Sequence, residues 1–166
     1  MALGTTAKLS NIKRSIDKYI HTNLVGTEEL IIDFEGVPFD NKGKKEWVQP
    51  RILDTNRVFL RQASGTEYGS QASLLLHMNI FVAKAVPGSG VTLADRHYLI
   101  RDVVANYFKI GQQIGIANYI GGSTVAVGYL EVDQLVTDMS IPTKDEFNQY
   151  SLAWEIRWTE LTTNPS

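Results

Sequence analysis

The chain has 166 residues, of which 43% are hydrophobic and 20% are charged, which is typical of one folded domain. Its formal net charge of −2 excludes the strongly basic field of many nucleic-acid-binding and membrane-surface proteins. It has no cysteine, which excludes disulfides, thiolate metal ligands and cysteine nucleophiles.

Charge is distributed unevenly along the chain. Residues 1–109 carry a net charge of +3, whereas residues 110–166 carry −5. Lys8, Lys13 and Arg14 precede any apolar run, so no signal peptide is predicted and synthesis in a cytoplasm is expected. The uncharged run at 110–130 contains five glycines, so it is predicted to form loop and strand rather than a membrane span.

The N-terminal part is predicted to form a helix, a short strand and an exposed excursion. Apolar residues recur at helical spacing over 7–24, with charged residues between them. Residues 30–34 indicate a short strand, and the stretch 36–46 is rich in turn-forming residues. A second strand is predicted over 47–60, where Pro50 indicates a sheet edge or a bulge because proline cannot donate to the ladder.

The middle of the chain is predicted to continue as loop, strand and helix. Residues 61–72 are predicted to form a loop, and the apolar run 73–83 a third strand. A helix is predicted from an N-cap at Thr92 to about residue 110. A fourth strand is then predicted over 123–136.

The last strand, 147–160, alternates large apolar and polar residues, which predicts one buried and one polar face of an antiparallel sheet. The element order predicts an α+β fold with a mainly antiparallel sheet of about five strands and two helices packed on one face. We expect a single domain over 1–166, with an ordered core over about 7–160.

No constellation of residues predicts catalysis or a cofactor. His21, His77 and His97 lie on different predicted elements and lack the spacing of metal ligands, so no metal site is expected. The turn PGSG at 87–90 lacks the lysine and hydroxyl residue of a phosphate-binding loop. We therefore expect a non-enzymatic domain whose surface serves assembly.

The sequence from 37 to 53, VPFDNKGKKEWVQPRIL, places a turn-rich insertion between Phe39 and the Trp-Val pair that opens a strand. A loop with Tyr68-Gly69, an alternating strand ending in FVAKAVPGSG and a helix opened by a threonine follow. This order of elements, over about 7–160, resembles the bacteriophage tail terminator family, also called tail completion or minor tail proteins.

The resemblance implies a small α+β subunit that closes into a ring, usually of six copies. Such a ring caps the finished tail tube, ends its polymerisation and joins the tube to the neck and head. The implied partners are further copies, the tail tube protein and a neck or connector protein, while genomic DNA passes through without specific binding. We expect no membrane partner, assembly in the host cytoplasm and a final location in the virion.

Residues of the excursion are the candidates for contacts between proteins. They are Phe39, Asn41, Lys42, Lys44, Lys45 and Trp47. For Trp47 the alternative is a core anchor at the start of its strand. The acidic C-terminal third is the candidate wall of the hole, because basic side chains would hold passing phosphates. Glu131, Asp133 and Asp138 are assigned to that wall.

Two other functions remain open from the sequence. A stopper or neck adaptor of the head-tail connector would also form a ring, but it would bind on the portal side. A small-ligand or nucleotide-binding enzyme is the alternative from a different class, and it would be a monomer stabilised by its ligand.

Overall fold

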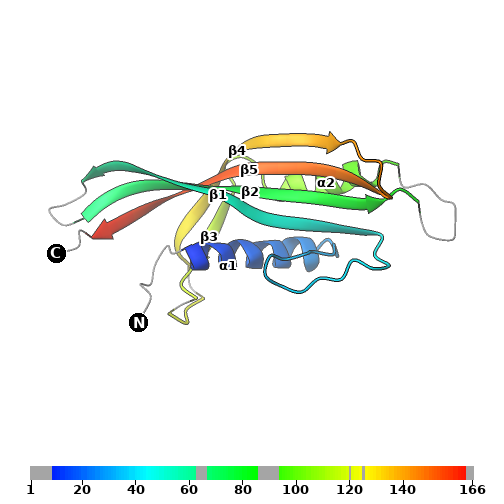
Figure 1. Ribbon diagram of the computed structural model, residues 1–166. Helices are drawn as coiled ribbons and strands as arrows, with labels where there is room; N and C mark the ends of the chain where they lie inside the picture. The colour runs from blue at the N-terminus through cyan, green and yellow to red at the C-terminus, as the bar shows by residue number, and fades with distance from the viewer. Residues whose placement is uncertain (1–8, 63–66, 86–93, 120, 125, 164–166) are drawn as a thin grey trace.

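The computed structural model describes residues 9–62, 67–85, 94–119, 121–124 and 126–163 (Figure 1). These residues form two α-helices, a π-helical extension of the first, and one five-stranded sheet. In chain order the elements are α1 (Leu9–Ile20), η1 (His21–Val25), β1 (Glu46–Gln62), β2 (Glu67–Ala83), α2 (Arg96–Tyr107), β3 (Gln113–Ala117), β4 (Ala126–Ile141) and β5 (Phe147–Thr163). The α+β prediction is confirmed.

The sheet is antiparallel throughout, in the order β1-β2-β5-β4-β3. Its centre is the pair β2 and β5, which runs without a register shift from Glu67 opposite Thr163 to Ala83 opposite Phe147. β4 follows β5 with two bulges, which reverse the alternation of its side chains for Gln134 and Leu135 and restore it from Thr137 on. In Figure 1 the long strands extend past the end of α1.

Both helices pack on the same face of the sheet, as predicted. α1 buries Ile12, Ile16 and Ile20, which lie one helical turn apart. α2 buries Ile100 and Val104, and all five belong to one core cluster with the alternate residues of β2 and β5. Burying each such side chain contributes about 1.5–3 kcal/mol, so this shared face holds the layers together.

The strand predicted over 30–34 is wrong, and Pro50 supplies the reason. Ile32 makes only an isolated parallel bridge with Val48, through Asp33 N to Val48 O (2.9 Å) and Val48 N to Ile31 O (2.9 Å). The next donor of a parallel ladder would be the amide of residue 50, which proline lacks. The guanidinium of Arg51 donates to the Asp33 carbonyl instead, at 2.7 Å. Of the two alternatives predicted for Pro50, a sheet edge or a bulge, the sheet edge is confirmed.

Further elements differ from the prediction, and β4 spans Ala126–Ile141 rather than 123–136. The predicted loop 61–72 is mostly strand, because β1 runs to Gln62 and β2 starts at Glu67. α2 runs from Arg96 to Tyr107, while the N-cap predicted at Thr92 lies outside the described residues. The strand β3 was not predicted, because its five residues, QIGIA, combine a glycine with no long apolar run.

Within the described residues, no helix is long and apolar enough to span a membrane.

Candidate interaction site

Trp47 anchors the excursion to the sheet. It is only 6% exposed, and its ring stacks on Phe81 with centroids 5.0 Å apart. Phe147 meets it edge-on at 5.0 Å, and Phe39 of the excursion lies against it at 6.0 Å. Trp47 is therefore a core anchor rather than a free contact, which corrects its assignment to the interface. By register, Trp47 and Phe81 face away from the helices.

The lysines of the excursion are presented by a tight turn. Lys44 N donates to Asn41 O at 3.0 Å, and Lys42 N donates to the Asp40 carboxylate at 2.9 Å. Gly43 has φ +74°, a conformation that favours glycine. Within this turn Lys42 is exposed, and the Lys44 ammonium lies 5.5 Å from the centre of the Phe39 ring. The two cations are thus held at the surface.

Lys45 has a different role from its neighbours in sequence. Its carbonyl accepts a hydrogen bond from Ala83 N at 2.7 Å, which continues the pairing of β1 with β2. Its side chain is exposed. The next residue, Glu46, binds Arg96 of α2 through both carboxylate oxygens, each at 2.8 Å. The excursion therefore ends at Lys45, where the sheet begins.

A hollow of about 600 Å³ separates the excursion from the end of β2 and the start of β5. The residues that line it are Asn41, Lys42, Gly43, Lys44, Ala83, Lys84, Ala85, Glu146 and Phe147. Lys84 donates to the carbonyl of Thr143 at 2.8 Å. None of the ion pairs among the described residues involves Lys42, Lys44 or Lys84. Three cations without a carboxylate partner therefore border one space, which we call the lysine pocket.

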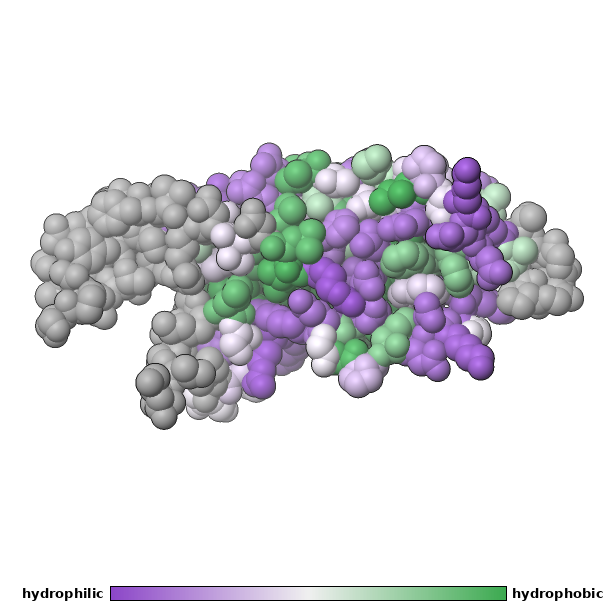
Figure 2. Space-filling model, viewed as in Figure 1, coloured by the Kyte–Doolittle hydropathy of each residue, from purple (hydrophilic) through white to green (hydrophobic). Residues whose placement is uncertain are grey.

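The lysine pocket combines predicted residues with others that the sequence did not indicate. Asn41, Lys42 and Lys44 were predicted as contacts, but Lys84 and Phe147 were not. They reach the pocket because Ala83 and Phe147 are direct partners in the sheet. Figure 2 shows hydrophilic side chains dominating this end of the molecule, where β2 ends in Figure 1.

The three carboxylates assigned to a ring wall do not form one surface. Glu131 and Asp133 share Arg157, at 3.1 and 3.2 Å, on the helix-free face of the sheet. Asp138 instead pairs with Leu152 in register and faces the helices, where it binds Arg101 and accepts from the Tyr150 hydroxyl at 2.7 Å. The hydrogen bond from Arg101 holds the pKa of Asp138 below its usual value. The assignment of these three residues to one acidic wall is therefore corrected.

The three histidines lie in separate parts of the fold. His77 and Ser151 lie 2.5 Å apart on the helix-free face, and desolvation lowers the pKa of His77. His97 is 5% exposed, its Nδ1 has no hydrogen-bond partner among the residues that the structure describes, and desolvation lowers its pKa. His21 stacks on Phe34 with centroids 6.4 Å apart. Among the described residues, no group of three His, Cys, Asp or Glu side chains could hold a metal ion.

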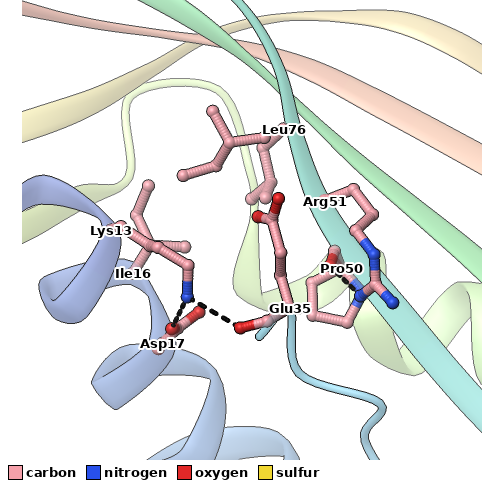
Figure 3. Close-up of a pocket in the computed structure, with 8 residues that line it drawn as sticks. Lys13, Ile16, Asp17, Glu35, Pro50, Arg51 and Leu76 are labelled. Atoms are coloured by element: carbon pink, nitrogen blue, oxygen red, sulfur yellow. Dashed lines mark hydrogen bonds and ion pairs between the residues drawn. The ribbon is translucent and has the colours of Figure 1, made fainter. Parts of the chain in front are cut away.

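A second hollow, between α1 and β1, is too small for a substrate (Figure 3). Its volume of about 10 Å³ corresponds to about one water molecule. Lys13 points across it, donating to Asp17 at 2.6 Å and to the Glu35 carbonyl at 3.2 Å. This cluster ties α1 to the segment before the excursion, and we assign it a structural role.

No protein-family model and no curated protein sequence matches the chain. Among solved structures, one chain without a functional name superposes with a TM-score of 0.58 at 12% identity, over 96% of this chain and 99% of that one. Another, described as the virion of a native gene transfer agent particle, has a TM-score of 0.49 at 11% identity, over 93% and 99% of the two chains. The first superposition shows a shared fold over nearly the whole chain.

Proposed function

We propose that this chain is a structural protein of a phage-like virion, and specifically a tail terminator. Copies would form a ring, usually of six, that caps the tail tube, ends its polymerisation and joins it to the neck. The proposal starts from the resemblance over about 7–160 and from the α+β architecture with both helices on one face. The observation that carries it is the sheet itself, because the described residues cover its helix-free face only around Trp47, where Phe39 packs, and leave part of one edge open.

The helix-free face is suited to contact with another protein. At its centre lie Ser151 and Ala153, which are small and almost fully buried by their neighbours. Met139, opposite Ser151 in register, is 52% exposed. The exposed methionine on this face is the feature that matches protein interfaces, in which methionine is enriched.

The edge strand β1 offers a second kind of contact. Beyond Pro50, no strand among the described residues pairs with the outer edge of β1. Open strand edges in native proteins are usually protected or used for strand addition by a partner. A ring subunit has such partners on both sides, so an open edge is compatible with assembly.

The partners in this proposal are further copies of the chain, the tail tube protein and a neck or connector protein. Genomic DNA would pass through the ring without specific binding. We propose no catalytic role, no cofactor and no membrane partner. The protein would be assembled in the host cytoplasm and end in the virion, between tail and neck.

The test is the native mass of the purified protein with and without tail tubes, together with imaging of where it binds. We expect a closed ring that attaches only to tube ends and prevents further addition of tube protein. A ring that ignores tubes and binds a portal complex would instead support a stopper or neck adaptor. A strict monomer that is stabilised by a nucleotide or metal would support an enzyme and overturn the proposal.

A further inference from the structure

The lysine pocket holds positive charge that the described residues do not neutralise. Lys42 and Lys44 approach from the excursion and Lys84 from the end of β2, while Glu146 is the one carboxylate among the residues that line the pocket. Ala83, Ala85 and Phe147 contribute apolar surface between these charges. The space is therefore shaped for a partner that brings carboxylates together with some apolar surface.

The same chain carries a complementary surface further along its sheet. Glu131 and Asp133 share the single cation Arg157, and Glu155 accepts a hydrogen bond from Gln134 at 2.7 Å. The cross-strand pairs of Glu131 with Arg157 and of Gln134 with Glu155 place the group on the helix-free face. Three carboxylates against one guanidinium leave a net negative charge. We call Glu131, Asp133 and Glu155 the acidic patch.

The two surfaces cannot meet within one molecule. Phe147 borders the pocket at the start of β5, and Glu155 lies eight residues further along the same strand, or roughly 26 Å at 3.3 Å per residue. β5 is hydrogen-bonded on both sides in this region, so it cannot fold back. Contact between pocket and patch therefore requires two copies of the chain.

We propose that the lysine pocket of one copy receives the acidic patch of the next. This inference rests on the proposed ring and names the contact that would build it. Each copy has one pocket and one patch, so the contact is heterologous and repeats around an axis until the ring closes. Partly exposed ion pairs of this kind weaken as salt rises, so assembly is salt-dependent.

The geometry favours a protein partner over DNA for the pocket. Duplex DNA presents a regular row of phosphates and is bound by cations spread along a stripe. Here three lysines converge on one hollow, with Glu146 at its border. Phe147 packs edge-on against Trp47 at 5.0 Å, which holds its ring in place against the sheet. A compact acidic patch fits this arrangement better than a phosphate backbone does.

The experiment uses two charge-reversed variants. The pocket variant combines Lys42→Glu, Lys44→Glu and Lys84→Glu, and the patch variant combines Glu131→Lys, Asp133→Lys and Glu155→Lys. A control, Arg14→Glu with Lys18→Glu and Lys109→Glu, makes the same change of charge at exposed positions that do not line the pocket. Native mass is measured at about 0.1 M salt, where exposed charges still interact over about 10 Å. Circular dichroism checks folding.

We expect the control to form rings and each reversed variant alone to remain monomeric. An equimolar mixture of the two variants should recover rings, because each reversed surface then meets its opposite charge. With one variant labelled by ¹⁵N, native mass spectrometry should find equal numbers of each in the ring. If the patch variant fails to fold, the neutral set Glu131→Gln, Asp133→Asn and Glu155→Gln replaces it and should lower the ring population at matched concentration.

Other outcomes overturn the inference. Rings formed by either reversed variant alone would show that pocket and patch are not the contact, while capping of tube ends by those rings would leave the proposed function intact. Folded variants whose mixture stays monomeric would show that the two surfaces do not bind each other. Intact rings of the pocket variant that lose binding to duplex DNA or to tube ends would assign the pocket to that partner. If the unmutated protein is monomeric at all concentrations, the inferred contact between copies is refuted. Whether that monomer still stops the elongation of tail tubes would then test the proposed function separately.

Discussion

Phe108, the residue that follows α2, lies against Trp154 in the middle of β5, with ring centroids 5.0 Å apart. Tyr19 of α1 meets Phe108 edge-on at 5.5 Å and donates its hydroxyl to the Tyr107 carbonyl at 2.7 Å. Both helices are therefore joined to the sheet through one aromatic stack. Trp154 lies at the base of this stack and is only 2% exposed.

Replacing Trp154 with alanine should lower the free energy of unfolding by about 3–5 kcal/mol, because it leaves a cavity beneath both helices. That loss is a large part of the ~5–15 kcal/mol stability of an ordinary domain. Urea denaturation followed by circular dichroism measures it. The control is Val136→Ala, at a position that is 53% exposed and should change stability by less than about 0.5 kcal/mol. Equal midpoints for the two variants would contradict the assignment of the faces.

The pH dependence of stability should depend on His97. Desolvation lowers the pKa of His97 in the folded protein below its usual value, so the unfolded chain binds the proton more readily. Stability is therefore greatest above about pH 6.5 and falls as the pH drops below that value. His97→Phe should reduce the loss between pH 7.5 and pH 5.5, with His77 retaining a contribution of the same sign.

The measurement for His97 is a series of urea midpoints across that pH range. His21→Gln is the matched control, because it removes an exposed histidine and leaves the buried His97 in place. A His97→Phe variant with the full pH dependence of the parent would show that protonation of His97 does not oppose folding.

The Asp33 carboxylate should hold the segment before the excursion against β1. It accepts from Gln49 at 2.7 Å and from Arg51 at 3.0 Å. Asp33→Ala removes the carboxylate oxygen that accepts both hydrogen bonds and leaves the guanidinium with fewer partners, which should cost about 1–3 kcal/mol. Hydrogen exchange should then accelerate at the amides of Asp33 and Val48, which bridge the segment to the strand. Unchanged exchange at these two amides, with Asp40→Ala as the control, would refute this role.

Shortening the excursion should separate folding from assembly. Replacing residues 40–44 with Asn-Gly retains Lys45 and Glu46, which bind Ala83 and Arg96. The thermal midpoint should move by less than ~4 °C, since exposed loops add little to the core. The variant should fail to limit the length of tail tubes. Normal tube lengths with the shortened protein would remove the excursion from the working surface.

The alternation in β5 was enough to predict which of its side chains face the core of an antiparallel sheet, because large apolar residues at every second position can only share one face. Trp47 could not be assigned in the same way. Its burial depends on Phe81 and Phe147, which lie 34 and 100 residues away and reach it only through strand pairing. Sequence periodicity does not report contacts of that range.

The candidate site was predicted only in part, for a related reason. The turn residues of the excursion indicated exposed lysines, but the pocket also needs Lys84 from the end of β2 and Phe147 from the start of β5. Likewise, the three carboxylates of β4 were grouped by charge in the sequence, yet Asp138 lies seven residues from Glu131, and an odd separation along a strand places two side chains on opposite faces. The two bulges together leave that relation unchanged, and they reverse the alternation only for Gln134 and Leu135 between them, which was not visible before the strands were paired.

Asp138 and Glu131 should therefore respond differently to neutralisation. Asp138→Asn weakens the pairing with Arg101 and the hydrogen bond from Tyr150 on the helix face, and we expect a loss of about 1–2 kcal/mol. Glu131→Gln removes one of two partners of a partly exposed arginine, and surface pairs of that kind contribute ~0–1 kcal/mol. Thermal melts at pH 7 compare the two variants.

The acid limb of the stability curve gives a second readout for Asp138. The pKa of Asp138 is lowered in the folded protein, chiefly by its hydrogen bond with Arg101, so its contribution is complete above the ordinary aspartate pKa of about 4 and is lost as the pH falls below it. Asp138→Asn should flatten the curve between pH 4 and pH 2, relative to the parent. If both neutral variants melt alike and retain the acid limb of the parent, Asp138 does not fix α2 to the sheet. If they differ as expected, charge reversal at Asp138 would disturb folding, and only Glu131 and Asp133 can be used to probe a surface role for the acidic strand.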